Sequence, residues 1–376
     1  MRAFQGALAF IAGLGAFASQ PSAFAAPSQP HVVFMMTNAA DKNEVLAFRE
    51  DVNSSTGYES RHYKTGGRGS GGVTDPLGAQ GSLVLSTDQQ LLFAVNAGSG
   101  DISVFHVHNA ALELVDTTPS GGSEPVAVAQ WGDRLYVVNA GGYGSVAVFK
   151  IKADGVLKQI KDSTVNLNGD LGGGSSITIR PDGKVVAVTE RGFNNIDTFA
   201  VNADGTLGPI VVNHSSAPGV FSAAFDQSGI LFVSETGAAG AANASAISSY
   251  SVMNGGALTA ITQSLPTYGT ANCWNATTPD GKRIYVSNAG SSTISGFNIG
   301  ANGALTAIGS TIVGTNPAGS TNIDIAISSD GRYLFSLNSG AGTISVFAIN
   351  TDGTLTLMLD PSAFDPSTGV NGIATL

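Results

Sequence analysis

The stretch LFAVNAGSGDISVF, residues 92–105, decides the fold because close copies of it recur along the chain. It joins two apolar runs through the small polar turn Asn96-Ala97-Gly98. Asn and Gly accept the backbone angles of tight turns, and both runs are rich in residues that favour strands. The stretch therefore predicts a hairpin between two buried strands.

Six further stretches align with this hairpin: VFMMTNAADKNEVLAF (33–48), LYVVNAGGYGSVAVF (135–149), VAVTERGFNNIDTF (186–199), LFVSETGAAGAANASAISSY (231–250), IYVSNAGSSTISGF (284–297) and LFSLNSGAGTISVF (334–347). The residues aligned with Asn96 are Asn38, Asn139, Glu190, Glu235, Asn288 and Asn338. The repeat is thus about 50 residues long, which is typical of propellers and solenoids.

Each repeat contains more than the hairpin. Asp-Gly turns close an upstream strand, as in ITIRPDGK (177–184), NATTPDGK (275–282) and IAISSDGR (325–332). A further turn and strand follow the hairpin, so each unit has four short strands, as in one propeller blade. We predict an all-β fold, a seven-bladed β-propeller of four-stranded antiparallel blades.

The two ends of the repeat region predict how the ring closes. The first copy has no inner strand before it, whereas the segment VNGIATL (370–376) is left over after the last copy. Closure removes the exposed edges of the sheets. We therefore expect the C-terminal strand to join the N-terminal blade.

Composition excludes several classes of protein. Charged residues make up 12% of the chain, Gly is abundant at 49 residues, and the net charge is -10. Without a concentrated basic face, we expect no nucleic-acid partner. Cys273 is the only cysteine, so no intramolecular disulfide can form, and we expect it to be a small buried hydrophobe.

The N-terminus has the order of a secretory signal. Arg2 precedes an apolar run over residues 7–18, and small residues follow it. We expect a signal peptide at 1–25, a short linker at 26–30 and a single propeller domain at 31–376. The mature protein would be secreted or periplasmic, with no membrane anchor, and we expect a monomer that binds a small-molecule ligand.

Glu190 and Glu235 break the repeat. In antiparallel blades the hairpin turns share one face of the ring with the connections between blades. Tight-turn chemistry accounts for Asn at the shared position but not for Glu. On this face we predict Glu190, Arg191 and Glu235 as catalytic residues.

Other residues on this face are candidate substrate contacts. The Gly-rich connection 64–82 carries Arg68 and is typical of an anion-binding nest or a mobile lid. His214 lies between the fourth and fifth blades, and Trp274 lies near the start of an inner strand, where it can stack on a ligand. Three turn asparagines complete the set, namely Asn96, Asn139 and Asn288.

The motifs LYVVNAG and IYVSNAG resemble the YVTN-type repeat of the seven-bladed lactonase family, which includes 6-phosphogluconolactonases and carboxymuconate cyclases. The resemblance implies a site of Arg, His and Glu at the mouth of the pore, with Glu190 matching the family's glutamate. The inner-strand starts SEPVAVAQ (123–130) and GGSSITIRPDG (173–183) lack the family's His-containing motif.

The sequence leaves four functions open. The first is a lactonase-like hydrolase in which Glu190 is the general base and Arg191, Arg68 or an Asn supplies the oxyanion donor. The second uses a cation, Ca²⁺ or Mg²⁺, held by Glu190, Glu235 and turn asparagines; without it, no cofactor or metal is expected. The third is a cyclase of the carboxymuconate type, and the fourth is a non-catalytic secreted binding or adhesion propeller.

Overall fold

The computed structural model describes residues 31–50, 58–169, 172–239 and 241–376, and residues 31–376 form one compact unit. The expected signal peptide and linker, residues 1–30, lie outside the described residues. The described residues form strands joined by turns and loops, and they include no helix long and apolar enough to cross a membrane.

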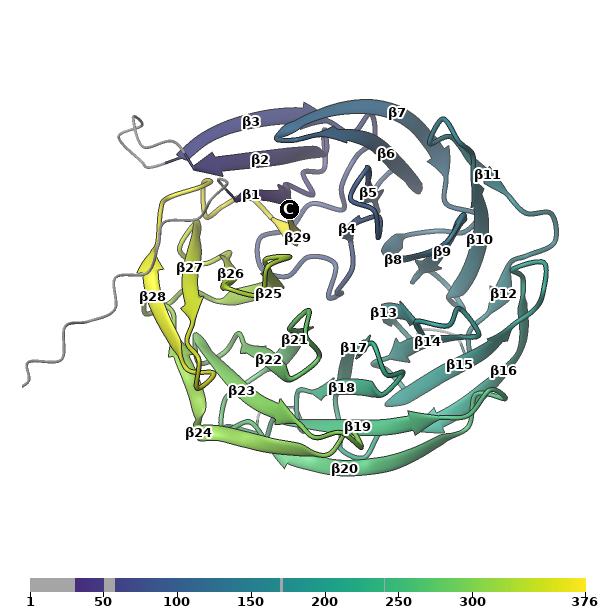
Figure 1. The fold of residues 1–376 in the computed structure, drawn as a ribbon. Coiled ribbons are helices and arrows are strands. Elements are labelled where there is room, and N and C mark those ends of the chain that lie inside the picture. Colours follow the sequence, from purple (N-terminus) through teal and green to yellow (C-terminus); the bar gives the residue numbers. More distant parts are fainter. Residues whose placement is uncertain (1–30, 51–57, 170–171, 240) are drawn as a thin grey trace, which may run out of the picture. The chain divides into compact units, whose positions relative to one another are not determined.

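Seven antiparallel sheets are arranged in a ring (Figure 1). Blade 1 contains, from the axis outward, β29 (Asn371–Thr375), β1 (Val32–Met36), β2 (Glu44–Glu50) and β3 (Tyr58–Lys64). The last strand, β29, pairs with β1, with Val33 opposite Thr375. The prediction that VNGIATL closes the ring is therefore confirmed.

The next three blades follow in chain order, each with its first strand innermost. Blade 2 contains β4 (Leu83–Leu85), β5 (Leu91–Asn96), β6 (Asp101–His108) and β7 (Ala111–Pro119). Blade 3 contains β8 (Pro125–Trp131), β9 (Arg134–Asn139), β10 (Ser145–Ile151), β11 (Leu157–Gln159) and the extra short strand β12 (Val165–Asn166), which pairs with β10. Blade 4 contains β13 (Gly174–Ile179), β14 (Val185–Glu190), β15 (Asn195–Val201) and β16 (Leu207–His214).

The remaining blades have the same order. Blade 5 contains β17 (Val220–Phe225), β18 (Leu231–Glu235), β19 (Ala246–Val252) and β20 (Leu258–Pro266). Blade 6 contains β21 (Asn272–Thr277), β22 (Arg283–Asn288), β23 (Thr293–Ile299) and β24 (Leu305–Thr315). Blade 7 contains β25 (Asn322–Ile327), β26 (Tyr333–Asn338), β27 (Thr343–Ile349) and β28 (Leu355–Leu359).

Aromatic residues of the repeat pack the blades against one another. The side chains of Phe93, Tyr136 and Tyr285, on the second strands of blades 2, 3 and 6, are fully buried. The Tyr136 hydroxyl donates to the Gly205 carbonyl at 3.1 Å, and the Tyr285 hydroxyl donates to the Gly353 carbonyl at 2.9 Å. Each bond reaches a turn of the following blade, so the tyrosines of the repeat join neighbouring blades.

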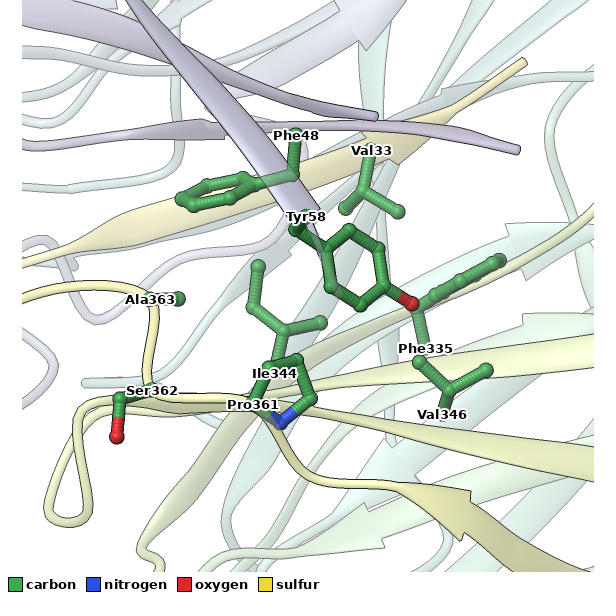
Figure 2. Close-up of a pocket in the computed structure, with 9 residues that line it drawn as sticks. All are labelled: Val33, Phe48, Tyr58, Phe335, Ile344, Val346, Pro361, Ser362 and Ala363. Carbon is green, nitrogen blue, oxygen red and sulfur yellow. The ribbon is translucent and has the colours of Figure 1, made fainter. Parts of the chain in front are cut away.

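The seam where the ring closes is apolar. Val33 and Phe48 of blade 1 meet Phe335, Ile344 and Val346 of blade 7 around a crevice of about 10 Å³, drawn in Figure 2. A space this small is close to the size of one water molecule, so the two blades are nearly fully packed here.

Candidate functional site

The connection between β3 and β4 runs into the middle of the ring (Figure 1). Leu77 and Ala79 are buried there. The Ala79 carbonyl accepts a hydrogen bond from the Trp274 indole at 3.0 Å, and Gln80 donates its amide to the Asn275 carbonyl at 2.7 Å. Residues 77–80 are therefore packed against inner strands of the ring. This packing does not agree with the expectation that the connection is a mobile lid.

A pocket of about 630 Å³ opens beside this connection. It lies on the face that carries the hairpin turns and the connections between blades, because residues 289–292 of one hairpin turn and residues from the stretch 315–321 of one connection line it. Its described lining residues are Thr74, Asp75, Ala271, Cys273, Trp274, Ala289, Gly290, Ser291, Ser292, Thr315, Asn316, Ala318, Gly319, Thr321 and Ile323. Most of this lining is small or hydroxyl-bearing, with one apolar wall that includes Trp274 and Ile323.

Asp75 is the only acidic residue among these described lining residues. Burial raises the pKa of its carboxyl to about 7, while the nearby charge of Arg191 acts in the opposite direction. The Asn371 amide donates to its Oδ1 at 3.3 Å. Its backbone has a φ of 42°, a left-handed conformation that Asp tolerates in turns, and its carbonyl accepts a hydrogen bond from the Gly78 amide at 3.1 Å. Asp75 is therefore suited to proton transfer near neutral pH.

Arg191 extends from the hairpin turn of blade 4 toward Asp75. Its guanidinium lies 5.4 Å from the centre of the Phe221 ring, and Phe221 packs edge-on against Trp274 with 5.0 Å between ring centres. The guanidinium occupies the place that a Cβ on Gly78 would need. A stacked, exposed Arg thus lies beside the segment that carries Asp75.

Asn316 adds an unusual polar group to the pocket wall. Its side chain is buried, and neither its Oδ1 nor its Nδ2 has a hydrogen-bond partner within the described chain. Buried amides are normally satisfied, so a partner from a bound ligand or water is expected. The hydroxyls of Ser291, Ser292 and Thr315 line the pocket beside it.

Asp324 and Cys273 lie near Asp75 and are buried. The two oxygens of Asp324 accept hydrogen bonds from the Ile325 and Ile373 amides at 2.9 and 3.2 Å. Burial raises the pKa of Asp324 to about 7, and Asp75 adds repulsion in the same direction. Burial also raises the pKa of the Cys273 thiol, as fits the small buried hydrophobe expected from the sequence.

Glu235 is held inside blade 5, away from the pocket lining. Its carboxylate accepts hydrogen bonds from the Ser215 hydroxyl at 2.7 Å, the Ala217 amide at 3.0 Å and the Ser248 hydroxyl at 2.9 and 3.0 Å. Burial raises its pKa, and the three donors act in the opposite direction. These contacts give Glu235 a structural role in joining a connection to two strands.

Glu190 is also buried inside its blade. Gly172 approaches Glu190 so closely that a Cβ there would overlap Oε1. The side chain faces Asp197 on β15, and burial followed by the neighbouring Glu190 raises the pKa of Asp197. Neither Glu190 nor Arg191 is among the described lining residues of the pocket, but the Arg191 guanidinium lies against Phe221 and Gly78, next to the segment that carries Asp75.

The other predicted contacts lie apart from the pocket. Arg68 is exposed in the connection that begins after β3, and His214 is exposed at the end of β16, the outermost strand of blade 4. Asn96, Asn139 and Asn288 are fully buried. Their amides donate to groups of their own blade or of the connection leading into it. Among the described residues that line the pocket, Trp274 is the one predicted substrate contact.

Asp75 and Asn316 were missed by sequence reasoning. Asp75 is the only acidic residue of the connection 64–82, and Pro76 follows it. An acid beside a Pro in a long Gly-rich connection is the signal that could have identified it. Asn316 lies between β24 and β25, where nothing in the repeat distinguishes it from other polar loop residues.

The chain belongs to the seven-bladed β-propeller lactonase family. The family model, described as a lactonase with a seven-bladed β-propeller, matches residues 75–172 and 246–365. These ranges include Asp75 and most of the pocket lining. A search of the curated proteins found no match to this sequence.

Solved structures share the fold. A Bacteroides fragilis protein assigned as a 6-phosphogluconolactonase is 19% identical, with 93% of this chain and 98% of that chain covered and a TM-score of 0.69. A periplasmic gluconolactonase of Pseudomonas aeruginosa is 17% identical, with 92% and 98% covered and a TM-score of 0.66. At these identities the likeness establishes the fold, and the chain is a lactonase-family propeller that resembles 6-phosphogluconolactonases.

Proposed function

We propose that this protein hydrolyses a lactone in the pocket at the pore mouth, with Asp75 as the general base. The observation that carries the proposal is the Asp75 carboxyl on the pocket wall, whose pKa of about 7 suits proton transfer at neutral pH. Membership of the lactonase family supports the class of reaction. The sequence-based choice of Glu190 as base is less well supported, because its carboxylate is enclosed within blade 4.

The reaction needs a base and an oxyanion donor. The Asp75 carboxylate would take a proton from water as the water oxygen bonds to the lactone carbonyl carbon. The carbonyl oxygen becomes negatively charged, and the Arg191 guanidinium or the Asn316 amide would stabilise this charge. When the ring C–O bond breaks, the protonated Asp75 would return its proton to the leaving oxygen and yield a hydroxy acid.

The pocket lining favours an uncharged sugar lactone over a phosphorylated one. Hydroxyl groups and the Asn316 amide suit the hydroxyls of a sugar ring, and Trp274 contributes an apolar wall. No Lys, Arg or His is among the described lining residues, so a phosphate group would find no cation in this lining. Arg191 lies outside it, against Phe221 and Gly78.

Proton release from gluconolactone and from its 6-phosphate tests this proposal, with spontaneous hydrolysis subtracted. We expect Asp75→Asn to lower kcat/KM by about 10²–10⁴. Asp41→Asn, a matched change of an exposed acid in the hairpin turn of blade 1, should leave kcat/KM unchanged. Full activity in Asp75→Asn would exclude Asp75 as the base, and no hydrolysis of any lactone by the wild type would refute the proposed function.

We also propose that the mature protein is secreted or periplasmic and works as a monomer. The order of residues 1–25 supports export. N-terminal sequencing of the mature protein tests this, with cleavage after Ala25 or Ala26 as the expected result. An intact N-terminus on the native protein would contradict it.

A further inference from the structure

Blade 4 differs from blades 2, 6 and 7 at the position where its second strand ends. In blades 2, 6 and 7 this position is Asn, whose Nδ2 donates to a Ser hydroxyl on the third strand. The pairs are Asn96 with Ser103 at 2.8 Å, Asn288 with Ser295 at 2.9 Å and Asn338 with Ser345 at 2.7 Å. In each of these blades the Asn amide N–H is therefore the donor to a side-chain oxygen on the third strand.

In blade 4, Glu190 replaces the Asn and Asp197 replaces the Ser. Glu190 on β14 is directly opposite Asn195 on β15, and Asp197 lies two residues further along β15. Side chains that pair across strands or are spaced by two share one face of a sheet. Glu190, Asn195 and Asp197 therefore gather on one face.

This cluster is buried, and the described residues supply few donors to its oxygens. Glu190 and Asp197 are 0% exposed and Asn195 is 2% exposed. Both carboxylate oxygens of Glu190 and the Oδ1 of Asn195 lack a hydrogen-bond donor within the described ranges, whereas the backbone amide of Asn168 lowers the pKa of Asp197. Two buried carboxyl groups with so few donors are costly, so a positively charged partner, or a proton shared by the two groups, is expected between them.

Blade 5 provides an internal comparison. Glu235 occupies the same position as Glu190 but accepts hydrogen bonds from Ser215, Ala217 and Ser248. Ser248 corresponds to Asp197, because each lies two residues after the partner of the glutamate in the strand ladder. The replacement of this Ser by Asp removes a donor and adds a second carboxyl. A buried glutamate alone therefore does not create the arrangement seen in blade 4.

We propose that Glu190, Asp197 and Asn195 bind a divalent cation, Ca²⁺, inside blade 4. All the available ligand atoms are oxygens of carboxylates and one amide, the set that hard cations prefer. The two positive charges balance two carboxylates. Full burial favours Ca²⁺ over Mg²⁺, which usually keeps several of its waters.

The cation would also support the pore mouth. Arg191 directly follows Glu190, and the Gly192 amide donates to the Gly172 carbonyl at 2.7 Å. A cation bound to Glu190 would fix the turn from which Arg191 reaches toward Asp75. The cation site itself rests on the contacts of blade 4 and does not depend on lactone hydrolysis.

Metal content and thermal stability of the full purified chain test this proposal. After equilibration with Ca²⁺ and desalting, elemental analysis should find about one Ca²⁺ per chain. Chelation should lower the Tm by several degrees, and Ca²⁺ should restore it more fully than Mg²⁺ does. A wild-type chain that binds no Ca²⁺ and whose Tm is unchanged by chelator would overturn the proposal. The two carboxyl groups would then be held together by a shared proton.

Two variants test whether Ca²⁺ binds at Glu190 and Asp197 or elsewhere in the chain. The double variant Glu190→Asn and Asp197→Ser installs the pair found in blades 2, 6 and 7, so it should fold, bind no Ca²⁺ and have a Tm that is insensitive to chelator. Glu235→Gln is the matched control and should keep the Ca²⁺ response of the wild type. Ca²⁺ bound in equal amount by the double variant would place the ion elsewhere and refute the assignment.

Discussion

The Trp274 indole nitrogen donates a 3.0 Å hydrogen bond to the carbonyl oxygen of Ala79, and this bond joins an inner strand of blade 6 to the connection between blades 1 and 2. Ala79 is 195 residues away from Trp274 in the sequence. The same connection carries Asp75 to the pocket wall. The position of the proposed base therefore depends on contacts made on the far side of the ring.

Trp274→Phe should loosen this connection. The variant keeps an aromatic ring beside Phe221 but leaves the buried Ala79 carbonyl without its donor, so we expect a loss of about 1–3 kcal/mol in the free energy of unfolding. Urea denaturation measures the loss. Trp131→Phe is the matched control, because Trp131 donates to the Pro181 carbonyl at 3.0 Å but is 41% exposed. An equal loss in both variants would contradict the buried role of Trp274.

Deletion of residues 371–376 should lower stability sharply. The deletion removes β29, whose five residues are all buried, and exposes the inner edge of β1. Loss of the Ile373 side chain alone is expected to cost about 2–5 kcal/mol. Thermal unfolding should show a large fall in Tm, whereas deletion of Leu376 alone should have a much smaller effect. An unchanged Tm after the longer deletion would mean that another strand closes the ring.

The repeat made the fold predictable, because the residues of each hairpin and Asp-Gly turn specify that turn locally, without help from distant parts of the chain. The site was harder to predict for two reasons. Glu190 stands out in the alignment, but its place at a turn gives no sign that its carboxylate is enclosed beside Asp197 and Gly172. Asp75 lies in a connection with no counterpart in the other blades, and only long-range packing of Ala79 and Gln80 shows where that connection runs.

The stability of the protein should fall as the pH rises from about 4 to 7. Burial raises the pKa of Asp324 from its ordinary 3.8 to about 7, so in this window the unfolded chain has lost a proton that the folded chain still holds. Stability then decreases with pH, by up to about 4 kcal/mol for this group, and levels off above 7. Asp75 changes stability in the same direction.

Asp324→Asn isolates the contribution of Asp324 to this pH dependence. The variant cannot ionise, so urea denaturation at several pH values should show a shallower fall in the free energy of unfolding than in the wild type. Asp41→Asn, at an exposed site, should keep the wild-type slope. Identical slopes in Asp324→Asn and the wild type would show that Asp324 ionises normally in the folded chain.

Arg191→Gln should reduce lactone hydrolysis. Removal of one donor to a developing oxyanion typically lowers kcat by about 10²–10³. We expect a loss in this range with a smaller change in KM, because the charge forms mainly in the transition state. Arg61→Gln, on the outer strand of blade 1, is the matched control. A loss confined to KM would instead assign Arg191 to ground-state binding.

Hydrolysis should also increase with pH through about 7. The general base must be ionised, and burial raises the pKa of the Asp75 carboxyl to about 7. A pH profile of kcat/KM should therefore rise on its acidic side with a midpoint near this value. A shifted carboxyl would titrate between pH 5 and 8, so a profile of kcat/KM that is flat over this range would argue against Asp75 as the general base.

Gly172→Ala should destabilise the chain because Gly172 lies directly against the Glu190 carboxylate in blade 4. A Cβ at this position would overlap the Glu190 Oε1, just as a Cβ at Gly67 or Gly269 would overlap the side chain of Asn96 or Asn288. The Glu190 side chain is enclosed and has little room to move away, so we expect a cost of about 1–3 kcal/mol, in the range of overpacked cores.

Gly255→Ala is the matched control for this change. A Cβ there meets no atom within 4 Å, and Gly255 does not have a positive φ, so the variant should be neutral or slightly stabilising. If the cation proposed above is bound between Glu190 and Asp197, Gly172→Ala should also weaken Ca²⁺ binding, because it displaces a ligand oxygen. Equal stability of the two variants in urea denaturation would show that Glu190 is free to move, and would weaken the case for a fixed cluster in blade 4.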